Sequence, residues 1–147
     1  MKNMEMTTKK SKLPLGVRLN NPLNIRYNSN IKWWGLKGES KGFCVFDTMV
    51  NGFRAAFKNL YSYYLRDWIT ISKIIEHWAP SSENDTNAYI AFVCEKTGLT
   101  AHENIYNPWT NKDLWIKIVL AMAWYETGVS PEDFEEDCVK GYTSAFK

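Results

Sequence analysis

The chain has 147 residues, of which 45% are hydrophobic and 23% charged, so it can bury the core of one folded domain. Its net charge of +2 argues against a dedicated nucleic-acid binder, which usually carries a basic face and a pI above about 9. No apolar run is long enough to cross a membrane, and the polar N-terminus lacks the apolar core of a signal peptide. We therefore expect a monomer made in the cytoplasm, with no nucleic-acid partner and no membrane span.

Aromatic residues make up 15% of the chain, with seven Trp, eight Tyr and seven Phe. The Trp and Tyr together exceed what the core of so short a chain needs. Flat amphipathic rings line grooves for sugars and for unpaired bases, because both ligands offer faces on which a ring can stack. Composition alone therefore permits a glycan or a single-stranded nucleic acid, and only the charge balance speaks against the second.

The three cysteines, Cys44, Cys94 and Cys138, are widely spaced and form no CxxC pair. An odd number at such spacing is typical of reduced, buried thiols and not of a disulfide framework or a zinc site. The two histidines have no paired spacing that would suit a metal ion. We expect no metal and no other cofactor.

The N-terminal part of the chain begins with a polar segment that carries four lysines and shows no periodicity, so residues 1–13 are predicted to be a disordered basic tail. Residues 14–147 are predicted to form one domain. Turn-forming residues between Gly16 and Tyr27 predict a structured loop. Two short apolar runs, residues 32–36 and 43–46, flank a turn that contains Gly and Ser, and this pattern predicts a small β-hairpin.

Helix signals dominate the rest of the sequence. Asp47 and Thr48 mark a helix start, and apolar residues at three-to-four spacing continue over residues 50–64. Thr70 opens a second, short helix that Pro80 ends. A polar loop then caps a third helix, residues 86–98, which Gly98 closes.

Two further helices are predicted near the C-terminus. Thr110 with Asp113 resembles a capping box, and a helix runs from there to Glu126. Pro131 is expected in the first turn of a final polar helix over residues 132 to about 139. The predicted fold is therefore mainly α, with one small β-hairpin.

Glu126 is the most unusual carboxylate in the sequence. It ends a helix in which residues 114–125 carry a single charge, Lys117, so the helix is expected to be the buried axis of the domain. A carboxylate there faces the negative end of the helix dipole in dry surroundings, and both effects raise its pKa. An acid that keeps its proton near neutral pH is what glycosidic-bond cleavage requires. The alternative is an exposed, ionised Glu at a frayed helix end.

Residues 16–26, Gly-Val-Arg-Leu-Asn-Asn-Pro-Leu-Asn-Ile-Arg, resemble the opening of small lysozyme-like proteins encoded by phages and mobile elements. The likeness is dense to about residue 98, above all in Trp-Ala-Pro-Ser-Ser-Glu-Asn-Asp-Thr of residues 78–86, and looser over the last long helix. The resemblance implies a lysozyme-like helical domain that cleaves the glycan strand of peptidoglycan. Because some members are virion structural proteins, a non-catalytic phage virion or cell-wall-binding module is the alternative.

A second resemblance is to the cell-wall glucosaminidases, whose catalytic Glu ends a buried helix that precedes an Asn-rich stretch, an aromatic-Asp-Ser helix start and an Asn-Tyr-Ala segment. Here residues 21–26, 46–48 and 87–89 are similar to the last three in the same order. The Glu helix is similar to residues 121–128, at the opposite end. The resemblance therefore implies a circularly permuted arrangement, in which the last long helix fills the place of the usual first one.

With Glu126 as general acid, the glycan can be cut by a lytic transglycosylase or by a muramidase- or glucosaminidase-type hydrolase. Tyr89, by resemblance, is a catalytic or cleft residue, or else a core ring. Glu83 is the rival acid, and its alternative is a helix-capping loop. Glu39, near the hairpin tip, is a possible second carboxylate across the cleft, with a solvated turn residue as its alternative. The candidates for substrate binding are Asn21, Asn24, Arg26, Trp34, Trp78, Asn84 and Asp85, which alternatively brace loops, cap a helix or belong to the core.

The expected partner is the peptidoglycan glycan strand, and the expected place of action is the cell wall or periplasm. Without a signal peptide the protein has to reach the wall by lysis, through a dedicated apparatus or inside a particle. A phage particle and a secretion or conjugation machine are therefore expected as alternative assemblies for it.

Overall fold

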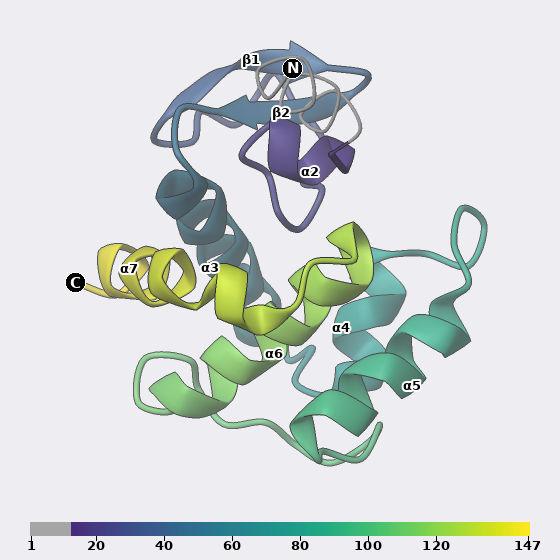
Figure 1. The fold of residues 1–147 in the computed structure, drawn as a ribbon. Helices are drawn as coiled ribbons and strands as arrows, with labels where there is room; N and C mark the ends of the chain where they lie inside the picture. Colours follow the sequence, from purple (N-terminus) through teal and green to yellow (C-terminus); the bar gives the residue numbers. More distant parts are fainter. Residues whose placement is uncertain (1–12) are drawn as a thin grey trace.

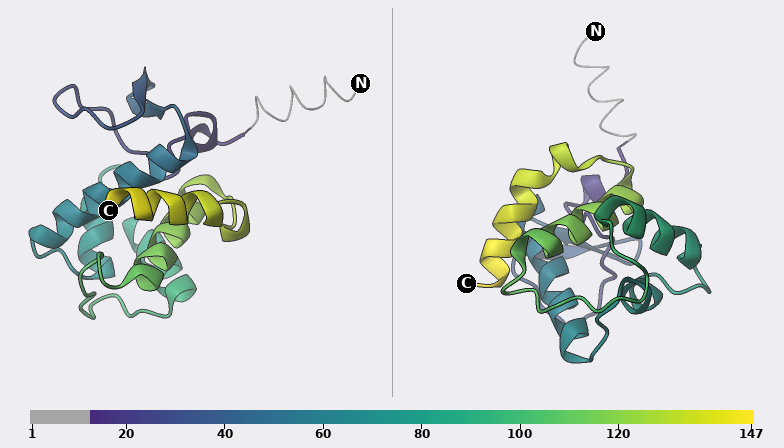
Figure 2. Two further views of the ribbon diagram at one scale, coloured as in Figure 1. Left: turned by 90° about the vertical axis from the view of Figure 1, so that its left-hand side faces the viewer. Right: turned by 90° about the horizontal axis from the view of Figure 1, so that it is seen from below.

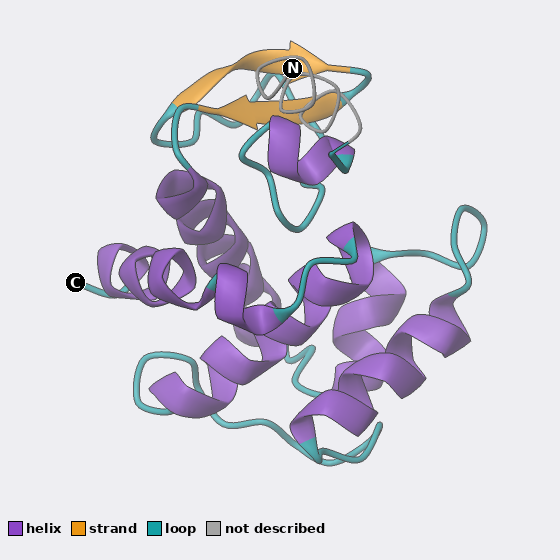
Figure 3. Cartoon of the chain, viewed as in Figure 1, coloured by secondary structure: helices purple, strands orange, loops and turns teal. Residues whose placement is uncertain are grey.

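The computed structural model describes residues 13–147, which contain six α-helices, one 3-10 turn and a two-stranded antiparallel sheet (Figure 3). The predicted class, mainly α with a small β-hairpin, is confirmed. The predicted basic tail, residues 1–13, lies outside the described residues except for Leu13. None of the helices between residues 13 and 147 has the length and apolar character needed to cross a membrane.

The hairpin and the short helix α2 lie together at one end of the molecule (Figures 1 and 2). Helix α2 (Leu15–Arg18) leads into the Asn-rich loop, and the strands β1 (Leu36–Ser40) and β2 (Phe43–Phe46) pair with Glu39 opposite Cys44. The Asn-rich loop pairs with β2 at one position, because Arg26 forms an isolated antiparallel β-bridge with Phe43. The loop is thereby fixed to the hairpin.

The first strand was predicted to begin at residue 32, and this boundary is wrong, because β1 begins at Leu36. The cause is a turn at Trp33–Leu36, in which the Leu36 N–H donates to the Trp33 carbonyl at 3.2 Å. Gly35 has a φ of 77°, a left-handed conformation that ends any strand entering from Lys32.

Three helices begin at the predicted residues. Helix α3 (Met49–Leu65) has Thr48 as its N-cap, and α4 (Ile71–Trp78) has Thr70. Helix α5 (Thr86–Thr97) is capped by Asp85, whose carboxylate accepts from the Ala88 N–H at 3.1 Å. Each cap oxygen accepts one of the backbone N–H groups that a helix start leaves without a partner. Gly98 closes α5 in the left-handed conformation, as predicted.

Helix α6 (Lys112–Thr127) is the axis of the domain, with α5 and α7 packed against it (Figure 1). Nine of its residues are buried, so the predicted buried helix is confirmed. The predicted capping box at Thr110 and Asp113 is wrong. Asn111 is the N-cap and makes no side-chain cap bond, and its Nδ2 donates to the Asn107 carbonyl at 2.9 Å. The Thr110 hydroxyl donates to Oδ1 of Asn107 at 2.7 Å and caps no helix.

The last helix, predicted over residues 132–139, is wrong at both ends. Residues Pro131–Asp133 form a 3-10 turn, and α7 runs over Glu135–Ala145. Helix α7 packs along α3 and buries Cys138, Gly141, Tyr142 and Ala145. Gly141 is required there, because a Cβ would lie 2.6 Å from Cβ of Phe53. This buried face consists of small and amphipathic residues, so apolar periodicity did not reveal its full length.

The three cysteines are free, with Cys44 and Cys138 buried and Cys94 half-buried. Burial raises the pKa of all three thiols, which disfavours the reactive thiolate. The predicted burial is confirmed for Cys44 and Cys138 and only in part for Cys94.

Candidate active site

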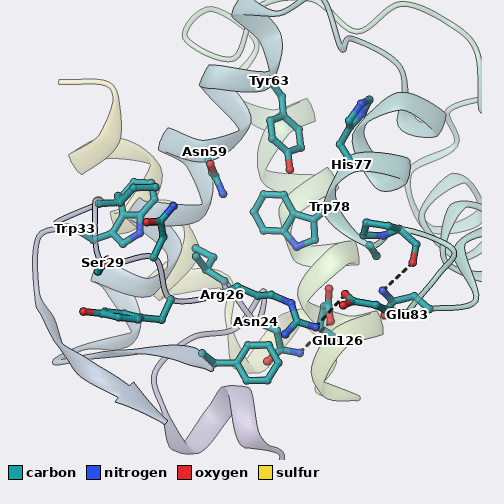
Figure 4. Close-up of a pocket in the computed structure, with 18 residues that line it drawn as sticks. Asn24, Arg26, Ser29, Trp33, Asn59, Tyr63, His77, Trp78, Glu83 and Glu126 are labelled. Atoms are coloured by element: carbon teal, nitrogen blue, oxygen red, sulfur yellow. Dashed lines mark hydrogen bonds and ion pairs between the residues drawn. The ribbon is translucent and has the colours of Figure 1, made fainter. Parts of the chain in front are cut away.

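A cavity of about 840 Å³ lies between the Asn-rich loop, the hairpin and the helices α3, α4 and α6 (Figure 4). A volume of this order is enough for a ligand of several rings. Its aromatic lining consists of Tyr27, Trp33, Phe43, Tyr63, His77 and Trp78. Its amide and hydroxyl lining consists of Asn24, Asn28, Ser29, Asn59 and Asn84. The charged or ionisable side chains other than His77 and the two tyrosines are Arg26, Glu83 and Glu126.

Glu126 reaches this cavity because α6 ends there. Gly128, with a φ of 78°, turns the chain away, and its N–H donates to the Trp124 carbonyl at 2.7 Å. Gly16 of α2 lets the Asn-rich loop approach the end of α6 closely. A Cβ at Gly16 would lie 3.0 Å from Oδ1 of Asn24 and 3.3 Å from Cγ2 of Thr127.

Both carboxyl oxygens of Glu126 accept hydrogen bonds. The amide Nδ2 of Asn24 donates to Oε1 at 3.0 Å, and the phenol of Tyr89 donates to Oε2 at 2.9 Å (Figure 4 for the Asn24 bond). Burial raises the pKa of Glu126 above its ordinary value, while the bonds from Asn24 and Tyr89 oppose the rise. The predicted direction of this pKa shift is confirmed, with burial as its main cause.

Tyr89 is buried in α5 and acts on Glu126 from the interior of the protein. Its ring stacks on Tyr125 with centroids 4.1 Å apart. Burial and the nearby Glu126 raise the pKa of Tyr89 well above 10.0, so the phenol keeps its proton at any ordinary pH. Tyr89 therefore remains a hydrogen-bond donor, with Oε2 of Glu126 as the nearer acceptor at 2.9 Å and the Met122 carbonyl at 3.4 Å.

Asn24 is held by the loop that contains it. Its φ of 52° is a left-handed conformation that Asn tolerates better than most residues, and its N–H donates to the Asn21 carbonyl at 3.1 Å. Asn21 is fully buried, and its Nδ2 donates to the carbonyls of Ile25 and Cys44 while its Oδ1 accepts from the Ile25 N–H. These bonds fix the loop so that the Asn24 amide faces Glu126.

Arg26 and Glu83 form an ion pair at the cavity, with Nη2 of Arg26 3.1 Å from Oε2 of Glu83 (Figure 4). The side chains are 62% and 54% exposed, so this pair is in contact with solvent whereas Glu126 is largely shielded. The cavity thus holds two carboxyl groups in opposite environments.

This chain is 34% identical to Protein P5 of Pseudoalteromonas phage PM2 in an alignment of 139 positions, which covers 89% of the chain and 81% of that phage protein. The chain belongs to the family of this phage protein. No protein-family model matches it. The predicted bacteriophage relationship is confirmed at this level.

In this member of the P5 family, the structure brings together many of the predicted site residues. Glu126, Asn24, Arg26, Glu83, Trp78 and Asn84 all line the cavity, and Tyr89 contacts Glu126 from behind. Trp78 lies at the end of α4, and its indole N–H donates to the Leu23 carbonyl at 3.1 Å. This bond connects α4 to the Asn-rich loop.

Four predicted residues lie elsewhere in this P5-family chain. Asn21 is buried in the loop, and Asp85 caps α5, so each takes the structural alternative. Trp34 is 66% exposed outside the cavity, with the guanidinium of Arg54 4.2 Å from its ring. The carboxylate of Glu39 accepts from the Gly42 N–H at 3.0 Å within the hairpin turn, so the structure gives no support to Glu39 as a second catalytic carboxylate.

Sequence reasoning missed several residues that line the cavity of this P5-family protein, and the most informative are Trp33, Asn59, Tyr63 and His77. Asn59 offered a signal, because it is a polar residue within the amphipathic pattern of α3. Tyr63 and Trp33 offered none, since their neighbours Tyr64 and Trp34 are of the same type. Among residues 13–147 no group of three or more His, Cys, Asp or Glu is placed to bind a metal ion.

Proposed function

We propose that this protein cleaves the glycan strand of bacterial peptidoglycan, with Glu126 as the general acid. One observation carries the proposal. A shielded carboxyl group, whose pKa is raised by burial, is held by Asn24 and Tyr89 at the wall of a large cavity. A protonated carboxylic acid in such a place is suited to donate its proton to a departing sugar oxygen.

Each oxygen of Glu126 accepts a hydrogen bond from a group that keeps its proton, Oε1 from the Asn24 amide and Oε2 from the Tyr89 phenol. Asn24 lines the cavity, whereas Tyr89 is buried in the interior. The two bonds together hold the carboxyl group of Glu126 in one orientation at the cavity wall.

The proposed step is balanced by a single carboxyl group. Glu126 gives its proton to the glycosidic oxygen as the bond from that oxygen to the anomeric carbon breaks, leaving an oxocarbenium-like sugar. The resulting carboxylate then takes a proton from the group that attacks the anomeric carbon. In a transglycosylase that group is the sugar's own 6-hydroxyl, and in a hydrolase it is water. Asn24 and Tyr89 stabilise the carboxylate between the two steps.

Glu83 is less suited to the acid role. It is more than half exposed, and its carboxylate already accepts from the guanidinium of Arg26. Glu83 is also the only other carboxyl group among the described residues that line the cavity. An inverting hydrolase needs a second carboxylate as general base, whereas a lytic transglycosylase needs only Glu126. The site therefore suits a lytic transglycosylase better.

The lining of the cavity supports an aminosugar polymer as the substrate. Ring faces such as those of Trp33, Tyr63 and Trp78 can stack against the apolar faces of pyranose rings. The amides of Asn28, Asn59 and others can exchange hydrogen bonds with hydroxyl and N-acetyl groups. Membership in a family of phage proteins fits a substrate that forms the wall of the bacterial host.

Turbidity and zymogram assays on purified sacculi test the proposal, with the wild-type protein and the variants Glu126→Gln and Glu83→Gln. Glu126→Gln is expected to reduce cleavage by about 10²- to 10⁴-fold, because the acid is lost while its shape remains. Glu83→Gln is expected to retain cleavage. The matched control is Glu95→Gln, which removes an exposed carboxylate of α5 that does not line the cavity.

Two outcomes would contradict the assignment. Cleavage that survives Glu126→Gln but not Glu83→Gln would transfer the acid role to Glu83. A wild-type protein that binds sacculi without cutting them would instead indicate the alternative function, a non-catalytic wall-binding or virion module. Mass spectrometry of the released muropeptides then separates the two chemistries, because the transglycosylase product is an anhydrosugar that lacks one water.

A further inference from the structure

The guanidinium of Arg26 is anchored to the hairpin independently of Glu83. The Arg26 backbone pairs with Phe43 of β2, and the guanidinium carbon lies 5.1 Å from the centre of the Phe43 ring. The flanking backbone is fixed as well, since the Tyr27 N–H donates to the Gly42 carbonyl at 2.8 Å. A cation is therefore presented at the cavity from a rigid part of the fold.

Glu83, in contrast, lies on the loop between α4 and α5, in which every residue from Pro80 to Asp85 is exposed. The loop is held by local bonds, among them the Glu83 N–H to the Pro80 carbonyl at 3.0 Å. Its only ion pair among the described residues is the one with Arg26. The pair therefore joins a fixed cation to a carboxylate on a surface loop, and both partners line the cavity that Glu126 also lines (Figure 4).

We propose that Arg26 is a binding site for carboxylates of the substrate, and that Glu83 holds this site in the structure until a substrate carboxylate replaces it. The inference rests on the proposed function and adds a substrate class to it. Peptidoglycan carries carboxylates close to its sugar ring, as the lactyl group of muramic acid and, when the lactyl group is amidated, on the stem peptide. A neutral chito-oligosaccharide carries none.

The energetics of the pair favour such an exchange. An ion pair between exposed side chains contributes about 1 kcal/mol or less, because water solvates both partners well when they are apart. Replacing Glu83 by a substrate carboxylate therefore costs little and preserves the fork geometry that a guanidinium offers to carboxylates. Since Glu83 and the substrate compete for one cation, removing Glu83 strengthens binding of an anionic glycan and removing Arg26 weakens it.

If Arg26 binds the substrate, replacing Arg26 and replacing Glu83 have opposite effects on affinity. If the ion pair only stabilises the shape of the cavity, both replacements weaken binding. Calorimetric titration measures the dissociation constants of Arg26→Gln and Glu83→Gln, both in the Glu126→Gln background so that no probe is cleaved. The three probes are a chito-oligosaccharide, a peptide-free muramic-acid glycan fragment and the same fragment with its stem peptides. Lys37→Gln and Glu95→Gln are the charge-matched controls on exposed residues outside the cavity.

For a carboxylate-bearing probe, Glu83→Gln is expected to tighten binding and Arg26→Gln to weaken it, each by about three- to fivefold. For the neutral probe neither variant changes binding by more than the controls. The probe that responds identifies the source, with the lactyl carboxylate read from the peptide-free fragment and the peptide carboxylates from the other. The effects shrink at high salt, because salt screens exposed charges.

The inference is overturned if both variants weaken binding, or if the neutral probe responds as strongly as the anionic ones. Equal binding of all three probes, unaffected by either variant, overturns it as well while leaving the proposed function intact. If no probe binds the parent protein, the proposed function itself fails. The two failures are therefore distinguishable.

Discussion

Asn24 and Glu126 are 102 positions apart in the chain, yet the amide of Asn24 donates directly to Oε1 of Glu126 at 3.0 Å. The contact joins the first ordered loop of the domain to the end of its last long helix. It exists because Gly16 permits the close approach and because α6 stops at Gly128. The candidate acid is thus completed only when both ends of the domain have folded together.

Asn24→Gly tests this contact without straining the backbone, because Gly adopts a φ near 52° as readily as Asn does. The bond from Asn24 lowers the pKa of Glu126, so its removal is expected to raise that pKa further. The alkaline limb of the pH–activity profile then moves to higher pH. The rate at the optimum falls about tenfold, since the carboxyl loses part of its orientation. An unchanged profile would show that Asn24 does not act through Glu126.

Tyr89→Phe removes the second donor to Glu126 and leaves a ring that fits the same buried space. We expect the rate of glycan cleavage to fall by about 10- to 100-fold and the pKa of Glu126 to rise. The free energy of unfolding should change by only about 1 kcal/mol, as for a single buried hydrogen bond. The two are measured by cleavage assays across pH and by urea denaturation.

Tyr125→Phe is the matched control for this experiment. The Tyr125 ring stacks on Tyr89, and its hydroxyl makes no side-chain hydrogen bond among the described residues. It is expected to retain cleavage within about twofold of the wild-type rate. Equal losses in the two variants would mean that ring packing, and not the Tyr89 phenol, supports the site.

The raised pKa of Glu126 also makes a prediction about stability. Because the folded protein binds this proton more tightly than the unfolded chain does, the group stabilises the fold fully only below its ordinary pKa of 4.5. That contribution is lost as the pH rises through the higher pKa of the folded state. Glu126→Gln cannot ionise, so its stability relative to wild type should increase with pH and then level off. Urea denaturation at several pH values between about 4 and 8 measures this difference, and a difference that shrinks with rising pH would contradict the prediction.

Much of the helical fold was predictable because its signals are local. Thr48, Thr70 and Asp85 each cap the helix that follows them, and Gly98 and Gly128 end two helices in the left-handed conformation. A cap bond joins residues only three or four positions apart, so it can be predicted from the local sequence. The extent of α7 was missed because it depends on packing against α3, which is a property of the folded chain.

The residues of the candidate site likewise fall into those with a local signal and those whose role depends on the folded chain. Glu126 was identifiable because a carboxylate after a long apolar segment is locally conspicuous. The sequence left the roles of Asn21 and Glu39 open, because their burial and partners depend on the hairpin, where Asn21 bonds to Cys44 and Glu39 to Gly42. Nothing local separates a polar residue that braces a loop from one that faces a ligand. Trp33 and Trp34 show the same limit most clearly, since two adjacent residues of one type face different surroundings.

These two tryptophans provide a test in which each residue is the control for the other. Trp33 lines the cavity, whereas Trp34 is 66% exposed outside it and stacks near Arg54. Trp33→Ala is expected to weaken binding of a chito-oligosaccharide by about tenfold, because a stacked aromatic ring contributes about 1–1.5 kcal/mol. Trp34→Ala is expected to change it by less than about twofold, as for other surface substitutions. Calorimetric titration in the Glu126→Gln background measures both constants. Since the two variants lose the same ring from adjacent positions, a loss of affinity in Trp34→Ala alone would place the sugar at Trp34 and Arg54 and not in the cavity beside Glu126.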